Sequence, residues 1–151
     1  MASVAGLNGT ANLAAYVAGK AGIIGLTKVA ALDYADQGIR VNVVAPGPIL
    51  THHLAAAGPE AQRQAGLATP MPRTGTAAEV AQVVLWLCSE QFSFVTGAVV
   101  PVDGGQSAAT SRRRCTGRGR RCPDGRRVVD NPVEGAAQSR CTAVGWRTDA
   151  V

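Results

Sequence analysis

Charged residues are scarce in this 151-residue chain, at 17%, whereas hydrophobic residues make up 46%. This balance excludes a highly charged disordered protein and favours a globular one. No apolar run approaches the ~20 residues that a membrane span needs. The N-terminal stretch MASVAGLNGT also lacks the basic segment and apolar core of a secretion signal. We therefore expect a cytoplasmic protein that has no membrane partner and is long enough for one domain.

Lysine is absent from the last third of the chain, and this absence accompanies an abrupt change in charge. Residues 1–106 contain five basic and six acidic residues, whereas residues 107–151 contain ten arginines and four acids. The net charge of +5 therefore comes from the second segment alone. The change predicts a folded domain over residues 1–105 and an Arg/Gly-rich, disordered extension over residues 106–151.

The extension also lacks the patterns of a specific site. Its cysteines are too widely spaced for the close C-x-x-C pairs of a zinc centre (Cys115, Cys122 and Cys141). Its arginines could contact phosphates, which leaves a nucleic-acid-binding arm as an alternative. The absence of aromatic residues and periodicity from its arginine-rich start favours disorder, so we do not expect nucleic acid as a partner.

Alternating helical and strand patterns in the first segment predict an α/β fold. Apolar residues at helical spacing predict a long helix over residues 13–35. The β-branched run IRVNVVA, residues 39–45, predicts a strand that ends at the following PGP. A second strand is expected within GAVVPVDGG, residues 97–105. Between the strands we expect a weak helix over residues 59–67 and a helix capped by Thr76 and Glu79 that runs to about Glu90. Strand, helix and strand in this order indicate a parallel crossover.

Two segments bear candidate chemistry. Tyr16 and Lys20 are four residues apart and so share a face of the long helix. An ammonium beside a phenol favours the phenolate, which suits proton transfer at a carbonyl or hydroxyl carbon. Ser3 could hydrogen-bond the same reacting oxygen. The segment APGPILT, residues 45–51, follows the first strand, where parallel sheets bind ligands. Taken separately, the pair is more typical of an ordinary helix and the segment of a proline-rich turn.

Together, these segments form an ordered set of motifs. The motifs, in order, are SVAG at residues 3–6, YVAGKAG at 16–22, RVNVVAPGPILT at 40–51, TG at 96–97 and VDGG at 102–105. The set resembles the C-terminal half of the short-chain dehydrogenase/reductase family, over residues 1 to about 105. The resemblance implies a Rossmann-like, doubly wound parallel sheet, N-terminally truncated in this chain. The arginine-rich extension has no part in it.

The resemblance implies a catalytic role for three residues. Tyr16 would be the acid/base that exchanges a proton with the substrate oxygen. Lys20 would stabilise the phenolate and bind the nicotinamide ribose, and Ser3 would orient the substrate oxygen. The implied substrate is a small alcohol or ketone, and hydride transfer would be the chemistry of the cofactor.

The resemblance also implies a binding site for NAD or NADP. Besides Tyr16 and Lys20, the implied cofactor-binding residues lie in the segment after the first strand (Pro46, Gly47, Ile49 and Thr51). Residues 51–72 correspond to a mobile substrate loop. His52 and His53 stand at its start without an obvious carboxylate partner, so we expect exposed loop residues and no metal site. A folded homo-oligomer is also implied.

The main departure from the family is an absent motif. No glycine-rich G-x-x-x-G-x-G turn, which would hold the pyrophosphate of the cofactor, precedes Ser3. By this resemblance, Met1 corresponds to an internal methionine of a longer protein. Roughly the first half of the family's domain would then be absent from this chain. We therefore expect an oxidoreductase with impaired activity. The alternative is a non-catalytic remnant or interaction module with a basic, nucleic-acid-binding tail.

Overall fold

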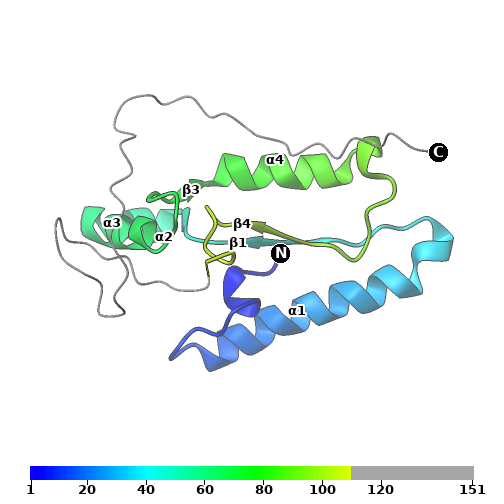
Figure 1. The fold of residues 1–151 in the computed structure, drawn as a ribbon, viewed down its shortest axis with the longest axis horizontal. Helices are drawn as coiled ribbons and strands as arrows, with labels where there is room; N and C mark the ends of the chain where they lie inside the picture. Colours follow the sequence, from blue (N-terminus) through cyan, green and yellow to red (C-terminus); the bar gives the residue numbers. More distant parts are fainter. Residues whose placement is uncertain (110–151) are drawn as a thin grey trace, which may run out of the picture. The chain divides into compact units, whose positions relative to one another are not determined.

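The computed structural model describes residues 1–109 of the chain (Figure 1). The predicted disorder and the nucleic-acid-binding alternative fall on the arginine-rich extension. Apart from its first four residues, that extension lies outside the described residues, and so do its three cysteines.

A parallel pair of strands forms the centre of the described segment. Strand β1 (Val43–Pro46) pairs with β4 (Val99–Val102), with Val43 opposite Val99. A second, shorter parallel pair joins β2 (Ile49–Leu50) to β3 (Gly75–Thr76). The parallel crossover predicted from the sequence is thereby confirmed, and the fold class is α/β.

The two long helices cover opposite faces of the central strands (Figure 1). Helix α1 (Ala14–Asp33) packs on one face, where Ile24 contacts Val43 and Ala45. Helix α4 (Ala77–Cys88) packs on the other face against Val44. Successive strand residues point to opposite faces, which explains why neighbours in β1 belong to two different cores.

Short helices connect these elements. A 3-10 turn, η1 (Val4–Gly6), precedes α1, and η2 (Ala35–Gln37) follows it; Gly38 then adopts a left-handed conformation and ends the helical segment. The segment between β2 and β3 contains α2 (His52–Ala56) and α3 (Pro59–Leu67). A further 3-10 turn, η3 (Glu90–Phe92), follows α4. The helix predicted over residues 59–67 coincides with α3, and the α4 cap has both hydrogen bonds of a capping box.

The first predicted strand begins four residues later than expected, at Val43 rather than Ile39. The side chain of Asn42 explains the difference, because its amide nitrogen donates to Val95 O at 2.8 Å and its oxygen accepts from Ala98 N at 3.0 Å. These bonds take the place of ladder bonds between the two backbones. The β-branched sequence pattern could not predict this difference. It does not show that a polar side chain, rather than the backbone, makes the hydrogen bonds to the neighbouring strand.

The N-terminus lies along the other edge of β1. Val43 N donates to Ala98 O, so this residue faces β4. The backbone groups of a strand alternate in direction, and Val44 O accordingly points to the opposite edge, where it accepts from Ala2 N at 2.8 Å. This bond fixes Ser3 near the carboxyl end of β1.

Helix α1 is apolar enough to contradict one expectation from the sequence. With 20 residues it passes a test of length and composition for a membrane span, contrary to the expectation that no segment would. The same test is passed by core helices of globular domains and is weak on its own. Ile24, Thr27 and Ala31 of α1 are buried against the rest of the fold, whereas Leu26 and Leu32 on the same helix are exposed.

Candidate active site

One cavity of about 760 Å³ is lined by all seven residues that the sequence singled out. The elements that meet there are the N-terminal residues, the first turns of α1, the segment after β1 and one face of α4. The predicted residues among its walls are Ser3, Tyr16, Lys20, Pro46, Gly47, Ile49 and Thr51. The structure thus brings together residues that are up to 48 positions apart in the sequence.

The polar side of the cavity consists of a hydroxyl, a phenol and an ammonium. Ser3 caps η1, and its Oγ accepts from Ala5 N at 3.2 Å, which leaves the hydroxyl proton available for another acceptor. Tyr16 and Lys20 lie one turn apart on α1, and Lys20 Nζ stands 5.5 Å from the centroid of the Tyr16 ring. The ammonium also donates to Met1 O at 3.5 Å. Lys20 is the only ionised side chain among the described residues that line this cavity.

Gly6 explains how the turn that contains Ser3 approaches α1 so closely. A Cβ atom at Gly6 would stand 2.8 Å from the backbone carbon of Lys20 and 2.9 Å from Lys20 Cβ. Distances below 3.0 Å are not tolerated by real Cβ atoms, so only glycine fits without a shift. The spacing between Ser3 and the Tyr16–Lys20 pair therefore depends on this backbone contact.

The segment after β1 forms the second wall. Gly47 N donates to Val102 O at 3.0 Å, which prolongs the contact with β4 beyond the last paired strand residues. Pro48 O accepts from Gly75 N at 2.9 Å and so attaches the same segment to β3. Ile49 and Thr51, the remaining members of this wall, are held by these two bonds at the carboxyl end of the sheet.

The apolar wall comes from α4 and was not predicted from the sequence. Its residues recur every three or four positions along the helix and are Ala77, Val80, Ala81, Val84 and Leu85. The helix itself was predicted, but no role in the site was assigned to it. The available signal was the small alanines at positions 77 and 81, since small side chains on an otherwise bulky helix leave room for a ligand or another chain.

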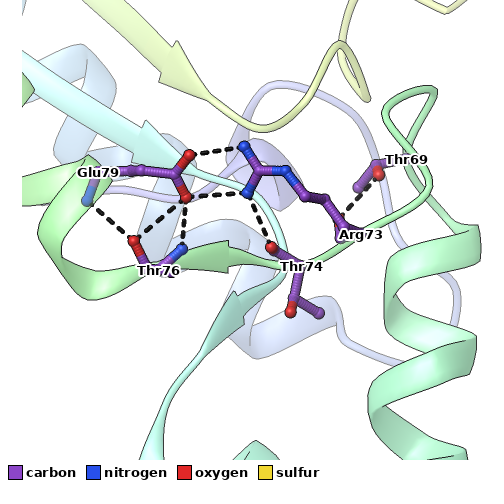
Figure 2. A network of polar contacts seen from close by, with 5 residues as sticks. All are labelled: Thr69, Arg73, Thr74, Thr76 and Glu79. Carbon is purple, nitrogen blue, oxygen red and sulfur yellow. Dashed lines mark hydrogen bonds and ion pairs between the residues drawn. The ribbon is translucent and has the colours of Figure 1, made fainter. Parts of the chain in front are cut away.

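A network of polar contacts fixes the start of α4 (Figure 2). Arg73 makes two hydrogen bonds to the carboxylate of Glu79, at 2.6 and 3.0 Å, and one to Thr74 O. Glu79 Oε2 also accepts from Thr76 N at 2.8 Å. Buried Thr69 donates to Gly66 O and Arg73 O, and so holds the chain that leaves α3. The hydrogen bonds from Arg73 and Thr76 lower the pKa of Glu79 to about 2.

We expect the Arg73–Glu79 contact to stabilise the fold in a pH-dependent way. The pKa of Glu79 is depressed in the folded state, so its contribution is present above the ordinary value of 4.5 and is lost as the pH falls toward 2. Both side chains are about half exposed, which limits the effect. Replacing Glu79 by Gln should lower the Tm by roughly 1 to 4 °C at pH 7 and by less at pH 3.

Thermal unfolding followed by circular dichroism measures this difference. Glu90→Gln is the matched control, because the side chain of Glu90 makes no hydrogen bond or ion pair within residues 1–109. A gap between wild type and Glu79→Gln that stays constant from pH 7 to pH 3 would contradict the assignment.

His52 and His53 lie where α2 begins, exposed, with their ring centroids 6.1 Å apart. Neither lines the main cavity. Within the described part of the chain, no three His, Cys, Asp or Glu side chains gather in a group that could hold a metal ion.

The parallel α/β arrangement, with a cavity at the carboxyl ends of its strands, is that of Rossmann-like proteins. Comparisons with known proteins specify the class further. Residues 1–107 match the family model described as "Enoyl-(Acyl carrier protein) reductase". The chain therefore belongs to the short-chain dehydrogenase/reductase family of oxidoreductases, as its motifs predicted.

Individual relatives support this assignment. The chain is 52% identical over 103 residues to cyclohexanol dehydrogenase from an Acinetobacter species, covering 68% of this chain and 40% of the relative. It superposes on the crystal structure of 3-oxoacyl-(acyl-carrier protein) reductase from Brucella melitensis with a TM-score of 0.67 and 45% identity, covering 72% of this chain and 41% of that one. A structure described as ElxO with NADP bound gives a TM-score of 0.66 at 35% identity, covering 72% and 45%.

The chain spans about two fifths of the length of the curated relatives it matches. The comparisons thus establish the family of residues 1–107.

Proposed function

We propose that residues 1–107 form the proton-transfer portion of an NAD(P)-dependent oxidoreductase that interconverts a small alcohol and the corresponding ketone or aldehyde. The observation on which the proposal depends is the cavity in which Ser3, Tyr16 and Lys20 meet the segment after β1. A hydroxyl, a phenol and an ammonium at one end of an apolar cavity suit a substrate whose single polar atom gains or loses a proton.

Each polar residue has a distinct task in this proposal. Tyr16 gives its phenolic proton to the carbonyl oxygen during reduction and takes it back during oxidation. Lys20, 5.5 Å from the ring centroid, stabilises the negative charge that develops on the phenolic oxygen. Ser3 donates its hydroxyl proton to the substrate oxygen while its Oγ stays bonded to Ala5 N. These groups orient the substrate before the reaction, which removes an entropic part of the barrier.

The cavity fits the nicotinamide end of a dinucleotide. It is concave and largely apolar. Lys20 is the candidate for binding the ribose hydroxyls of the cofactor, and Thr51 is the candidate for binding the nicotinamide amide. When bound, the dinucleotide supplies or accepts the hydride. The relative described with NADP bound supports the cofactor class. The names of the relatives, a cyclohexanol dehydrogenase and a 3-oxoacyl reductase among them, support an alcohol or ketone substrate.

We further propose that the chain alone binds the dinucleotide weakly and turns over slowly. The sequence contains no G-x-x-x-G-x-G turn, and Lys20 has the single positively charged side chain among the described walls of the cavity. The pyrophosphate therefore meets no cluster of donors comparable to a glycine-rich helix N-terminus.

A titration with NADH and NADPH, followed by nicotinamide fluorescence, tests the binding site. We expect saturation only at dinucleotide concentrations of roughly 1 mM or higher. Lys20→Met should weaken binding about tenfold, because it removes an ammonium that hydrogen-bonds the cofactor; this loss corresponds to about 1.4 kcal/mol.

Lys28→Met is the matched control, since Lys28 lies two turns further along α1 and outside the cavity. Equal weakening by both variants, or no saturable signal for the wild type with either dinucleotide, would argue for the non-catalytic alternative.

Exposed apolar residues on α1 favour self-association of the protein, for which we propose a location in the cytoplasm. Helix α1 presents Leu26, Val29 and Leu32 to solvent, and Leu32 is 81% exposed. Large apolar side chains that are exposed on one helix are typical of protein interfaces. We propose that α1 contributes to a homo-oligomer of the folded protein, which sedimentation velocity would detect.

A further inference from the structure

The turn that follows β4 touches both sides of the candidate site. We call residues 103–107 the Asp103 turn. Its backbone contacts the segment after β1 and the segment after α3, which are remote from each other in the sequence. The first contributes to the cofactor wall, and the second belongs to the loop that we assign to the substrate.

The contact with the cofactor wall is a close approach at Gly47. A Cβ atom at this position would stand 2.8 Å from both Cα and Cβ of Asp103 and 3.1 Å from Gln106 Oε1. Gly47 N also donates to Val102 O, immediately before the turn. The Gly47 backbone therefore packs directly against Asp103, at a distance that leaves no room for a side chain, and a hydrogen bond joins it to the residue before the turn.

The contact with the substrate-side loop is a hydrogen bond with tight packing around it. Met71 N donates to Gly104 O at 3.2 Å. Gly104 and Gly105 both have positive φ, and Cβ atoms there would stand 3.4 Å from Thr69 Cβ and 3.3 Å from Pro70 Cγ. The positive φ values of the turn thus favour glycine at both positions, and its packing against Thr69 and Pro70 is close.

The side chain of Asp103 holds the turn in this shape. Its Oδ1 accepts from Gly105 N at 2.9 Å, and its Oδ2 accepts from Ser107 N at 2.6 Å. Partial burial tends to raise the pKa of this carboxyl, but the hydrogen bonds from Ser107, Gly105 and Gln106 outweigh it and leave the pKa below its usual value. A charged carboxylate that accepts several amide hydrogen bonds holds the turn firmly, because hydrogen bonds to an ionised acceptor are stronger than those between neutral groups.

A second cavity, of about 380 Å³, lies among the same segments. Its walls include Pro48 from the cofactor side, Met71 from the substrate side, and Asp103 to Gly105 between them. A cavity beside the turn means that packing alone does not fix the distance between the two segments. The hydrogen bonds of the turn have to do so.

We propose that Asp103 is a positioning residue that holds the cofactor-side segment at Gly47 and the substrate-side loop at Met71 at one fixed spacing. The role for catalysis rests on the proposed function, whereas the mechanical linkage does not. Asp103 touches neither reactant; it acts through the turn. Loss of its carboxylate releases both segments together.

Amide hydrogen exchange of the full chain tests the linkage directly. The variant is Asp103→Asn, which keeps an acceptor for Gly105 N and turns an amide donor toward Ser107 N. We expect exchange at Gly47 and at Met71 to accelerate together by at least tenfold, while exchange at Ile24 in α1 stays within twofold of wild type. Asp36→Asn, on the exposed turn η2, is the control and should change none of the three.

Three outcomes would overturn the proposal: acceleration at only one of the two segments, acceleration at neither, or equal acceleration at Ile24. The last would show general destabilisation. Asp103→Ala is the stronger variant; if it fails to fold, Asp103→Asn still decides the question. Because exchange needs no turnover, a failure of the linkage is distinguishable from a failure of the proposed enzyme activity.

Steady-state kinetics distinguish a positioning role from a merely structural one, because a structural role would leave the KM values unchanged. With both segments released, Asp103→Asn should raise the KM for the alcohol and for the dinucleotide by at least threefold each. A smaller folded fraction would lower the maximal rate and leave both KM values unchanged, and that result would contradict a positioning role.

Discussion

Tyr16→Phe should lower nicotinamide-dependent turnover by roughly 100-fold or more, because it removes the one hydroxyl proposed to exchange a proton with the substrate oxygen. The ring, its position on α1 and its contact with Lys20 remain, so binding of the dinucleotide should change little. The measurement is the initial rate of NADH or NADPH consumption with a panel of small ketones.

The same measurement can be made in a hybrid protein, in which a full-length relative supplies the rest of the domain. Residues 1–107 would replace the matching segment of the Brucella melitensis reductase, which is 45% identical and of which this chain covers 41%. Tyr34→Phe is the control, since Tyr34 is 45% exposed against 48% for Tyr16 but lies outside the cavity at the end of α1. If the Tyr16→Phe hybrid turned over as fast as the unsubstituted hybrid, Tyr16 would not be the acid/base.

Gly6→Ala should damage both the stability and the geometry of the site. The added methyl group meets the backbone of Lys20 at 2.8 Å, and backbone atoms have no alternative rotamer. Overpacking of this kind costs about 1 to 3 kcal/mol, which corresponds to a Tm roughly 5 to 15 °C lower for a domain of about 100 residues. The displaced turn also moves Ser3 away from Tyr16, so activity should fall even in the molecules that remain folded.

Gly9→Ala provides a control only three residues away. A Cβ atom at Gly9 would meet no heavy atom of residues 1–109 within 4 Å. We expect its Tm to stay within about 2 °C of wild type. Thermal unfolding and initial rates of the two variants are compared side by side, and similar losses in both would refute the role assigned to the Gly6 contact.

The helices and the topology were predictable because local patterns determine them. The helix over residues 13–35 and the capped helix from Thr76 appear in the structure as α1 and α4, with ends displaced by one or two residues. Helix periodicity and a capping box depend on neighbours within one turn. The parallel crossover followed from the order of strand, helix and strand.

The features that sequence patterns missed are long-range. Asn42 shortens the first strand through bonds to Val95 and Ala98, more than fifty residues away. The α4 wall of the cavity depends on where the helix lies relative to β1. The paired strands β2 and β3 contain only two residues each, too few for any periodicity. The seven candidate residues do line one cavity, while their chemical roles stay predictions.

The contact between Gly6 and Lys20 also has a bearing on the order of folding. It closes a loop of about 14 residues, whereas the pairing of Val43 with Val99 closes one of about 56. Loop-closure entropy makes the longer connection more costly by about 1.2 kcal/mol. Ser3, Tyr16 and Lys20 can therefore come together within the local segment formed by η1 and α1 before the sheet forms, and the segment after β1 joins them only when the slower, non-local pairing is complete.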